Sequence, residues 1–99
     1  MPPMLLTERE TGKGRLVSVC DADVLGEEFE NGTVSLSVDR EFYEGEKASK
    51  KQVINSLSRC SVANLVGTRA VGVAIEHGFV EEENVLEFEG TRHAQLLWL

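Results

Sequence analysis

The sequence feature that most constrains the fold is the apolar stretch at residues 60–79, CSVANLVGTRAVGVAIEHGF, which carries no acidic residue before position 76. Its apolar residues recur at helical intervals, and such spacing favours a helix with one buried face. Gly78 is typical of a helix end, because glycine adopts the left-handed conformation without a steric penalty. We therefore predict a central buried helix over residues 65–77, with Asn64 or Thr68 as its N-cap and Asn64 preferred.

The length of 99 residues, with 41% hydrophobic and 27% charged residues, is typical of one folded domain spanning residues 1–99. No apolar run approaches the roughly 20 residues that span a bilayer. The first residues lack the basic region and long apolar core of a signal peptide. We expect a cytoplasmic protein without a membrane segment.

The chain carries 17 acidic and 10 basic residues, a net charge of −7. This surplus argues against a broad electrostatic contact with nucleic acid, whose affinity comes largely from neutralised phosphates. A local basic patch is still compatible with it. The acidic surface is expected either to serve solvation in a salty cytoplasm or to form a binding face.

Alternating polar and apolar residues predict several strands. A glycine-rich turn at residues 11–14 joins the first two strands into a hairpin. Residues 21–26 predict a single helical turn capped by Asp21. The predicted strands are residues 4–8, 15–21, 33–38, 85–88 and 93–99.

A second helix is predicted over residues 50–59. Ser49 and Gln52 have the spacing of a capping box, and apolar residues follow at helical intervals. Phe42 and Tyr43 lie in an acidic loop before it and are expected to cover the core. The predicted fold is α+β, with about five strands in an antiparallel or mixed sheet, two main helices and a short helical turn.

The residues that commonly bind metals lack the spacing of a metal site. Cys20 and Cys60 form no CxxC pair, and together with His77 and His93 they show no zinc-finger or zinc-ribbon pattern. In a reducing cytoplasm both cysteines are expected to be buried small side chains rather than a disulfide. We predict no metal and no cofactor.

Asp21 and Asp23 are the strongest candidates for acid–base chemistry, because two nearby carboxylates can hold a divalent cation or move a proton. Such residues more often cap a turn. The sequence also shows no nucleophile–base pairing and no phosphate-binding loop of the form GxxxxGK[ST]. We predict that the chain is not an enzyme.

The first candidate binding site is the predicted start of the central helix, where free N–H groups and the helix dipole favour an anion. Glycine there allows a ligand to approach, and an arginine follows one turn later. A helix cap with a packing glycine is the alternative. The candidate residues are Asn64, Gly67, Thr68 and Arg69.

The second candidate site is the segment at residues 90–95, where a glycine turn presents donors to a phosphate or to base edges. A tight turn with polar tips is the alternative. The candidate residues are Gly90, Arg92, His93 and Gln95. If both sites lie on one side of the molecule, Arg69, Arg92 and His93 form a composite cationic pocket for RNA or a small anion.

The C-terminal residues Leu96 to Leu99 are very apolar for a free chain end. They are expected either to pair within the sheet or to be covered by another subunit. A homodimer through this segment is therefore one prediction.

Five short segments occur in a fixed order along nearly the whole chain. They are CDADVLG at 20–26, FYEG at 42–45, VANLVG at 62–67, AIEHG at 74–78 and GTRHAQ at 90–95. This ordered set resembles the archaeal family called domain of unknown function four-two-four. The resemblance implies a short single-domain protein without an established activity, sometimes described as predicted RNA-binding with a tie to translation.

Our leading hypothesis is a non-enzymatic, RNA-binding accessory protein whose partner is RNA or the translation machinery. One alternative is a protein-interaction or homodimerising module that binds no RNA. A further alternative is a small anion binder that uses the start of the central helix.

Overall fold

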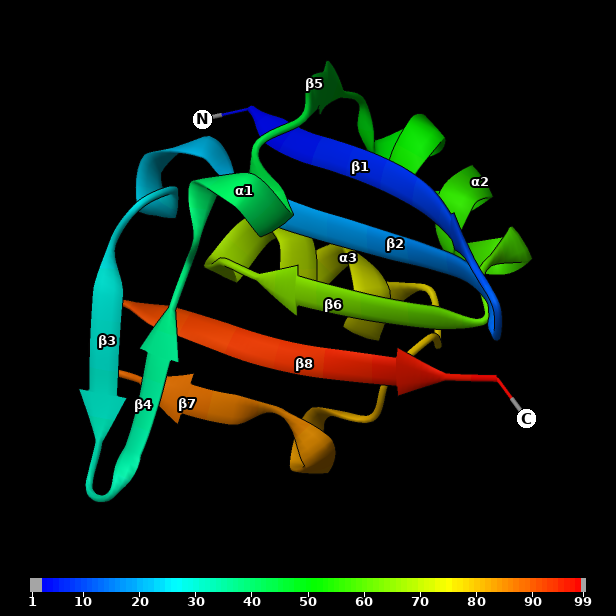
Figure 1. The fold of residues 1–99 in the computed structure, drawn as a ribbon. Helices are drawn as coiled ribbons and strands as arrows, with labels where there is room; N and C mark the ends of the chain where they lie inside the picture. Colours follow the sequence, from blue (N-terminus) through cyan, green and yellow to red (C-terminus); the bar gives the residue numbers. More distant parts are fainter. Residues whose placement is uncertain (1–2, 99) are drawn as a thin grey trace.

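The computed structural model describes residues 3–98 and shows an α+β fold built on a six-stranded mixed sheet (Figure 1). The strands of this sheet lie in the order β5 (Glu46–Ala48), β1 (Met4–Thr11), β2 (Gly14–Asp21), β6 (Val62–Val66), β8 (Thr91–Leu97) and β7 (Leu86–Phe88). Neighbouring strands are antiparallel except β2 and β6, which run parallel. The predicted α+β class is confirmed, and the predicted mixed sheet is slightly larger than expected.

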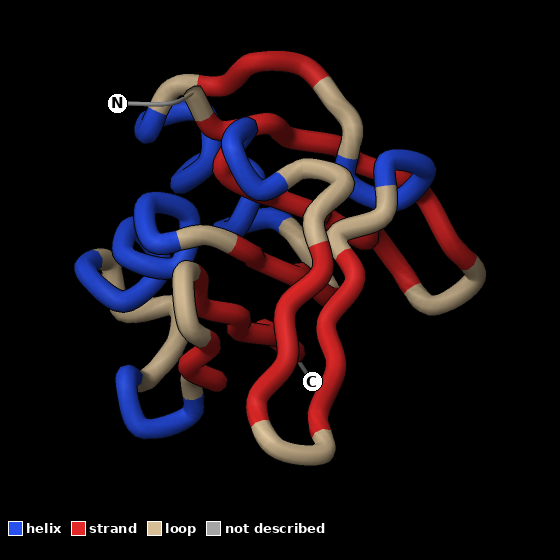
Figure 2. The backbone as a smooth tube through the Cα atoms, turned by 90° about the vertical axis from the view of Figure 1, so that its left-hand side faces the viewer, coloured by secondary structure: helices blue, strands red, loops and turns tan. Residues whose placement is uncertain are grey.

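Two main helices cover one face of this sheet. Helices α2 (Lys50–Arg59) and α3 (Thr68–Glu76) lie behind the sheet in Figure 1, and the short helix α1 (Arg40–Tyr43) lies in front of it. Strands β3 (Glu28–Asn31) and β4 (Val34–Ser37) form a separate two-stranded sheet, which stands out as an arm in Figure 2. Two single 3-10 turns are η1 (Ala22–Val24) and η2 (Glu82–Asn84). We call the sheet face opposite α2 and α3 the open face.

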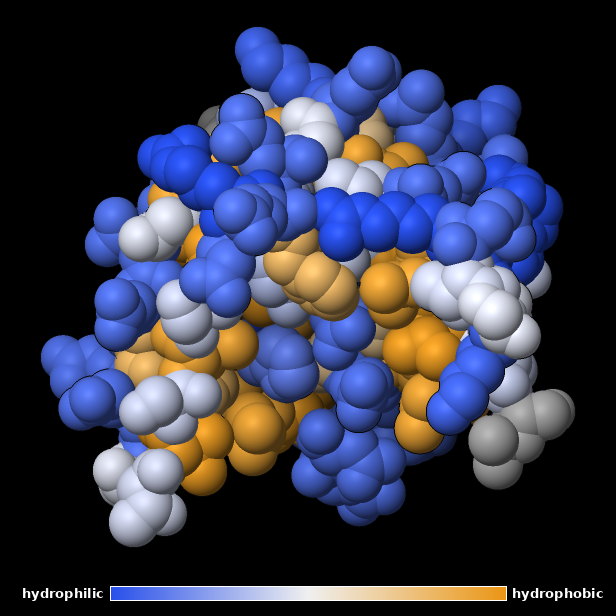
Figure 3. All heavy atoms as spheres, viewed as in Figure 1, coloured by the Kyte–Doolittle hydropathy of each residue, from blue (hydrophilic) through white to orange (hydrophobic). Residues whose placement is uncertain are grey.

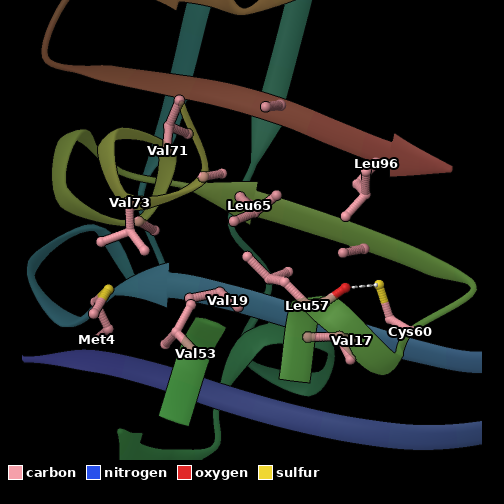
Figure 4. Close-up of a cluster of buried hydrophobic side chains, with 14 residues drawn as sticks. Met4, Val17, Val19, Val53, Leu57, Cys60, Leu65, Val71, Val73 and Leu96 are labelled. Carbon is pink, nitrogen blue, oxygen red and sulfur yellow. Dashed lines mark hydrogen bonds between the residues drawn. The ribbon is translucent and has the colours of Figure 1, made fainter. Parts of the chain in front are cut away.

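The main core lies between the sheet and the two long helices (Figure 4). Val17, Val19 and Leu65 from the sheet pack with Val53 and Leu57 of α2, and all five are fully buried. Burying one such side chain contributes about 1.5–3 kcal/mol. A second cluster lies on the other face, beneath α1 and η1. Its buried members are Leu5, Cys20, Val24, Val38, Tyr43 and Val66.

The apolar stretch at residues 60–79 is divided between a strand and a helix, so the predicted long helix is wrong at its start. Val62–Val66 forms the central strand β6, and Asn64 lies in mid-strand rather than at a helix cap. Helix α3 begins at Thr68, directly after Gly67, whose φ is 120°. A short apolar run has the same appearance in a buried strand and in a buried helix. Here the strand ends and the helix begins at Gly67, because glycine readily adopts the positive φ of this junction.

Asp21 at the end of β2 caps α3. Its Oδ2 accepts the N–H of Arg69 at 2.8 Å, and its Oδ1 accepts the N–H of Ala70 at 2.9 Å. A Cβ atom at Gly67 would lie 2.3 Å from the Asp21 carboxyl carbon, so the cap and the glycine turn depend on each other. Asp21 also occupies the predicted N-cap position of the turn η1, but its side chain makes no hydrogen bond to that turn.

Other local predictions have mixed outcomes. Ser49 and Gln52 form the predicted capping box, and α2 has the predicted bounds. The first hairpin is confirmed and is longer than expected. Phe42 and Tyr43 lie in α1 rather than in a loop, with their rings edge to face at 4.9 Å. The C-terminal strand begins at Thr91, two residues before its predicted start at residue 93, so Arg92 lies in β8 rather than in the predicted turn.

Asp21→Ala is expected to lower the free energy of unfolding by about 2–4 kcal/mol, because it leaves two N–H groups of α3 without an acceptor. Urea denaturation followed by circular dichroism measures the change. Asp23→Ala is the matched control, since it removes the same charge at an exposed position and should change stability by no more than about 0.5 kcal/mol. Equal losses in the two variants would contradict the capping role.

Candidate functional site

The start of α3 holds a carboxylate of its own chain. The N–H groups that would bind an anion there are those of Arg69 and Ala70, and Asp21 accepts both. Burial raises the pKa of the Asp21 carboxyl, while the two backbone hydrogen bonds and the Arg69 charge act to lower it. The structure therefore fills the predicted anion position internally. Asn64 lies in the middle of β6, where it pairs with Ser18 and Gln95, and it does not take part in this cap.

Arg92 and His93 project to opposite faces of β8. Ala94 and Leu96 pack in the core beneath the helices, and side chains alternate along a strand. Arg92 therefore shares the helix-covered face, whereas His93 and Gln95 lie on the open face. The predicted pocket of Arg69, Arg92 and His93 is not assembled in this arrangement.

Two glutamates bind the guanidinium group of Arg92. Its Nε donates to Oε2 of Glu87 at 3.0 Å, and its Nη2 lies 3.5 Å from Oε1 of Glu82. The Arg92 side chain is only 19% exposed. Gly90 precedes this strand in an exposed turn. Arg92 therefore holds η2 and β7 against β8, and its charge is largely compensated.

A row of polar side chains crosses four adjacent strands on the open face. Residues that face one another on neighbouring strands share a face of the sheet. The register joins β1, β2, β6 and β8 through one such line of partners. We call this line the polar row, and it consists of Thr7, Ser18, Asn64 and Gln95. Two of the residues predicted from the sequence, Asn64 and Gln95, are direct neighbours in it.

Apolar side chains flank the polar row on both sides. Towards the C-terminal end of β8 the next row contains Leu16, Val62 and Leu97. On the other side it contains Cys20 and Val66, and it continues to His93 and Leu86. Figure 3 shows apolar areas on this side of the molecule at the lower left, around β4 and β7, and near the end of β8, with polar side chains between them.

The open face carries no carboxylate from the main sheet. Every aspartate and glutamate in the six strands lies at a position facing the other side, as the register and the alternation of side chains show. The chain has 17 acidic residues in all. Within the main sheet, acidic side chains thus lie on the face opposite the polar row, a segregation that neither composition nor net charge indicates.

Helix α1 covers one end of the polar row. The Cys20 Sγ donates to the carbonyl of Tyr43 at 3.9 Å, and the Arg9 guanidinium lies 5.5 Å from the centre of the Phe42 ring. The Arg9 Nη2 also donates to the Glu41 carbonyl at 2.5 Å. Because Cys20 and Arg9 lie in the two rows that flank the polar row, α1 spans it at this end. We call Arg9 and Phe42 the roof.

A hollow of about 670 Å³ lies beside the roof. It is lined by Arg9, Asp39, Arg40, Glu41 and Phe42. The two arginines give this end of the open face its cations, although two carboxylates border the same hollow. The aromatic ring and the guanidinium groups are of the kind that stack on planar ligands.

Several hydrogen-bonding groups on the open face have no partner within residues 3–98. The hydroxyls of Thr7 and Ser18 are buried without a hydrogen bond, and Ser18 is only 1% exposed. A buried hydroxyl without a partner costs about 1–3 kcal/mol. His93 is half-buried, and burial lowers the pKa of its imidazole below 6.5.

The described residues present no metal centre. Among residues 3–98, no three histidine, cysteine or acidic side chains gather closely enough to hold a metal ion. Cys20 and Cys60 are buried and free, and burial raises the pKa of the Cys20 thiol to about 12. In the same part of the chain, no helix is long and apolar enough to cross a bilayer.

Sequence patterns did not indicate Thr7, Ser18, Arg9 or Phe42 as members of one surface. The available signal was local, since Ser18 interrupts an otherwise apolar alternation in β2. The row itself depends on the pairing of β2 with β6, which are 40 residues or more apart. The spacing of residues along the sequence does not predict the register of such a pairing.

His93 predicts a pH dependence of stability. Its pKa in the folded chain lies below the unfolded value, so the folded state binds this proton less tightly. The stability it contributes is complete above pH 6.5 and is lost as the pH falls through the lower, folded pKa. Wild type should therefore lose stability on acidification from pH 7.5 to about pH 5.5, and His93→Gln should lose less. The free energy of unfolding is measured by chemical denaturation at both pH values. Equal losses in wild type and His93→Gln would contradict the role of His93.

The family model described as Protein of unknown function (DUF424) matches residues 8–99. No curated protein matches the chain. A crystal structure of an uncharacterized conserved protein from Methanopyrus kandleri is similar, with a TM-score of 0.76 and 23% identity over 97% of this chain and 94% of that one. This likeness concerns the fold alone. Since the family match covers nearly all of the sequence, the chain belongs to the family of proteins of unknown function DUF424.

Proposed function

We propose that the chain is a non-enzymatic, cytoplasmic RNA-binding accessory protein that contacts unpaired RNA on the open face. The tie to translation that the family resemblance implies is part of this proposal. Its support comes from the open face, because carboxylates of the chain itself bind at both candidate sites that were expected from the sequence. The start of α3 binds Asp21, and Arg92 binds two glutamates.

The observation that carries the proposal is the segregation of charge. An acidic protein repels RNA least at a surface with few carboxylates, because the phosphate backbone is the dominant charge of the ligand. The strands of the main sheet place no aspartate or glutamate on the open face. The same face presents the amides of Asn64 and Gln95, and the arginine of the roof lies at the other end of the polar row.

These side chains suit single-stranded RNA. Proteins recognise RNA sequences mostly in unpaired segments, where bases hydrogen-bond through their edges and stack on aromatic rings or guanidinium planes. Asn64 and Gln95 each offer both donors and an acceptor. Phe42 and Arg9 supply an aromatic ring and a guanidinium plane at the end of the same row.

Gln95→Glu tests the proposal by placing one carboxylate on the open face with almost no change of shape. It should weaken binding of a fluorescently labelled single-stranded RNA by about tenfold at low salt, where charge repulsion is least screened. Fluorescence anisotropy measures the affinity.

The matched control is Gln52→Glu, which adds the same charge on α2. Glutamate is compatible with the capping box that Gln52 completes, so this variant should fold normally and bind RNA within about twofold of wild type. If wild type shows no retention of RNA at low salt, or if both variants lose affinity equally, the proposal fails.

A second candidate function is homodimerisation or binding of another protein through the C-terminal end. Leu97 is 57% exposed on the open face and Trp98 is 51% exposed, although the Trp98 indole donates to the Leu57 carbonyl at 3.3 Å. Leu96 is buried in the core and pairs with β6, so it is not available to a partner. Leu99 lies outside the described residues.

Leu97→Ser tests this alternative without removing a core residue. If the C-terminal end forms a homodimer, multi-angle light scattering should give a dimer mass for wild type and a monomer mass for the variant, because the contact loses its apolar centre. Leu86→Ser is the control, since it replaces an exposed leucine on β7. A folded monomer in all three samples would count against the homodimer.

A further inference from the structure

We propose that unpaired RNA lies across the strands along the polar row, recognised through its base edges, with Arg9 as the principal contact to phosphate. This inference rests on the proposed function and states which part of the RNA the protein reads. It is carried by three observations: the length of the row, its unused hydrogen-bonding groups, and the scarcity of cations around it.

The polar row has the dimensions of an extended binding floor. Neighbouring strands lie about 4.8 Å apart, so four side chains in line span about 14 Å across the sheet. The row runs at right angles to the strands. It is bordered on one side by Leu16, Val62 and Leu97, and on the other by Cys20 and Val66, which are fully buried in the second cluster. A flexible single strand can follow such a line, with the flat faces of its bases against Leu16, Val62 and Leu97.

The row also holds unused capacity for hydrogen bonds. The side-chain amides of Asn64 and Gln95 make no hydrogen bond to any residue between 3 and 98, and neither do the hydroxyls of Thr7 and Ser18. Amides and hydroxyls complement the donors and acceptors of base edges and of the 2′-hydroxyl group. Ser18 is only 1% exposed, so a ligand reaches its hydroxyl after the side chains above it move.

Cations are scarce along the row. On the open face of the six strands, Arg9 and Lys47 are the lysine and arginine residues that the strands present, and Arg40 of α1 lines the hollow beside Arg9. A double helix is bound mainly through its phosphates and needs several such contacts. The composition of this face therefore favours an unpaired strand, and it favours contacts to bases over contacts to the backbone.

An abasic strand separates the two kinds of contact. It keeps every phosphate and lacks the bases at its central positions. Wild type should bind a mixed-sequence RNA at least about tenfold more tightly than the matched abasic RNA, since each pair of base-edge hydrogen bonds is worth about 1–3 kcal/mol. The dependence of log affinity on log salt concentration should have a slope of only about −0.7, as expected for one phosphate contact on a single strand.

Variants assign these effects to side chains. Asn64→Ala should weaken binding about tenfold and leave the salt slope unchanged, because it removes a base contact. Arg9→Ala should bring the slope close to zero. The control Asn84→Ala removes an exposed amide on η2 and should bind like wild type.

Ser18→Ala distinguishes a ligand contact from a structural role. The hydroxyl has no partner in the fold, so its removal should maintain or raise the melting temperature, while RNA affinity falls. A fall in melting temperature with unchanged RNA affinity would show that Ser18 serves the fold alone and would overturn its assignment.

Equal affinity for intact and abasic RNA, with a salt slope steeper than about −2, would overturn recognition through base edges and leave the proposed RNA binding in place. Failure of wild type to bind any single-stranded RNA would overturn both.

Discussion

The cap that Asp21 forms on α3 is the interaction on which the arrangement of the fold depends. It joins the end of β2 to the start of a helix 47 residues later, across the turn at Gly67. Burial of this carboxylate is unfavourable, as its raised pKa shows, and two backbone hydrogen bonds and the positive end of the helix dipole offset that cost. Because the cap fixes where β6 stops and α3 begins, it also fixes which strand residues face the helices.

The same cap explains why binding is assigned to the open face. The start of a helix is an attractive anion site in principle, and here the chain supplies the anion itself. Arg92 is compensated in a similar way by Glu82 and Glu87 on the helix-covered side. The residues of the polar row that stay unpaired are neutral amides and hydroxyls, and they lie on the face where the six strands present no aspartate or glutamate.

Local signals in the sequence predicted those parts of the fold that depend on neighbours along the chain. The capping box at Ser49 and the first hairpin are examples, since their chemistry is complete within a few residues. The division of residues 60–79 was not predicted, because apolar periodicity cannot separate a buried strand from a buried helix. Asn64 and Gln95 were named as candidates from motifs that suggested a helix cap and a turn. Their true relation, facing positions on β6 and β8, comes from the sheet register.

Ser18 gives a physical reason to regard the polar row as more than a solvated sheet surface. An ordinary polar side chain on an open sheet face bonds to water, but Ser18 is only 1% exposed and has no partner in residues 3–98. Alanine would occupy nearly the same volume without the cost of a desolvated hydroxyl, which is about 1–3 kcal/mol. The fold alone therefore does not account for serine at this position. A ligand that displaces the side chains above Ser18 and accepts the hydroxyl would account for it, and would link the covered and exposed halves of the row in a single binding surface.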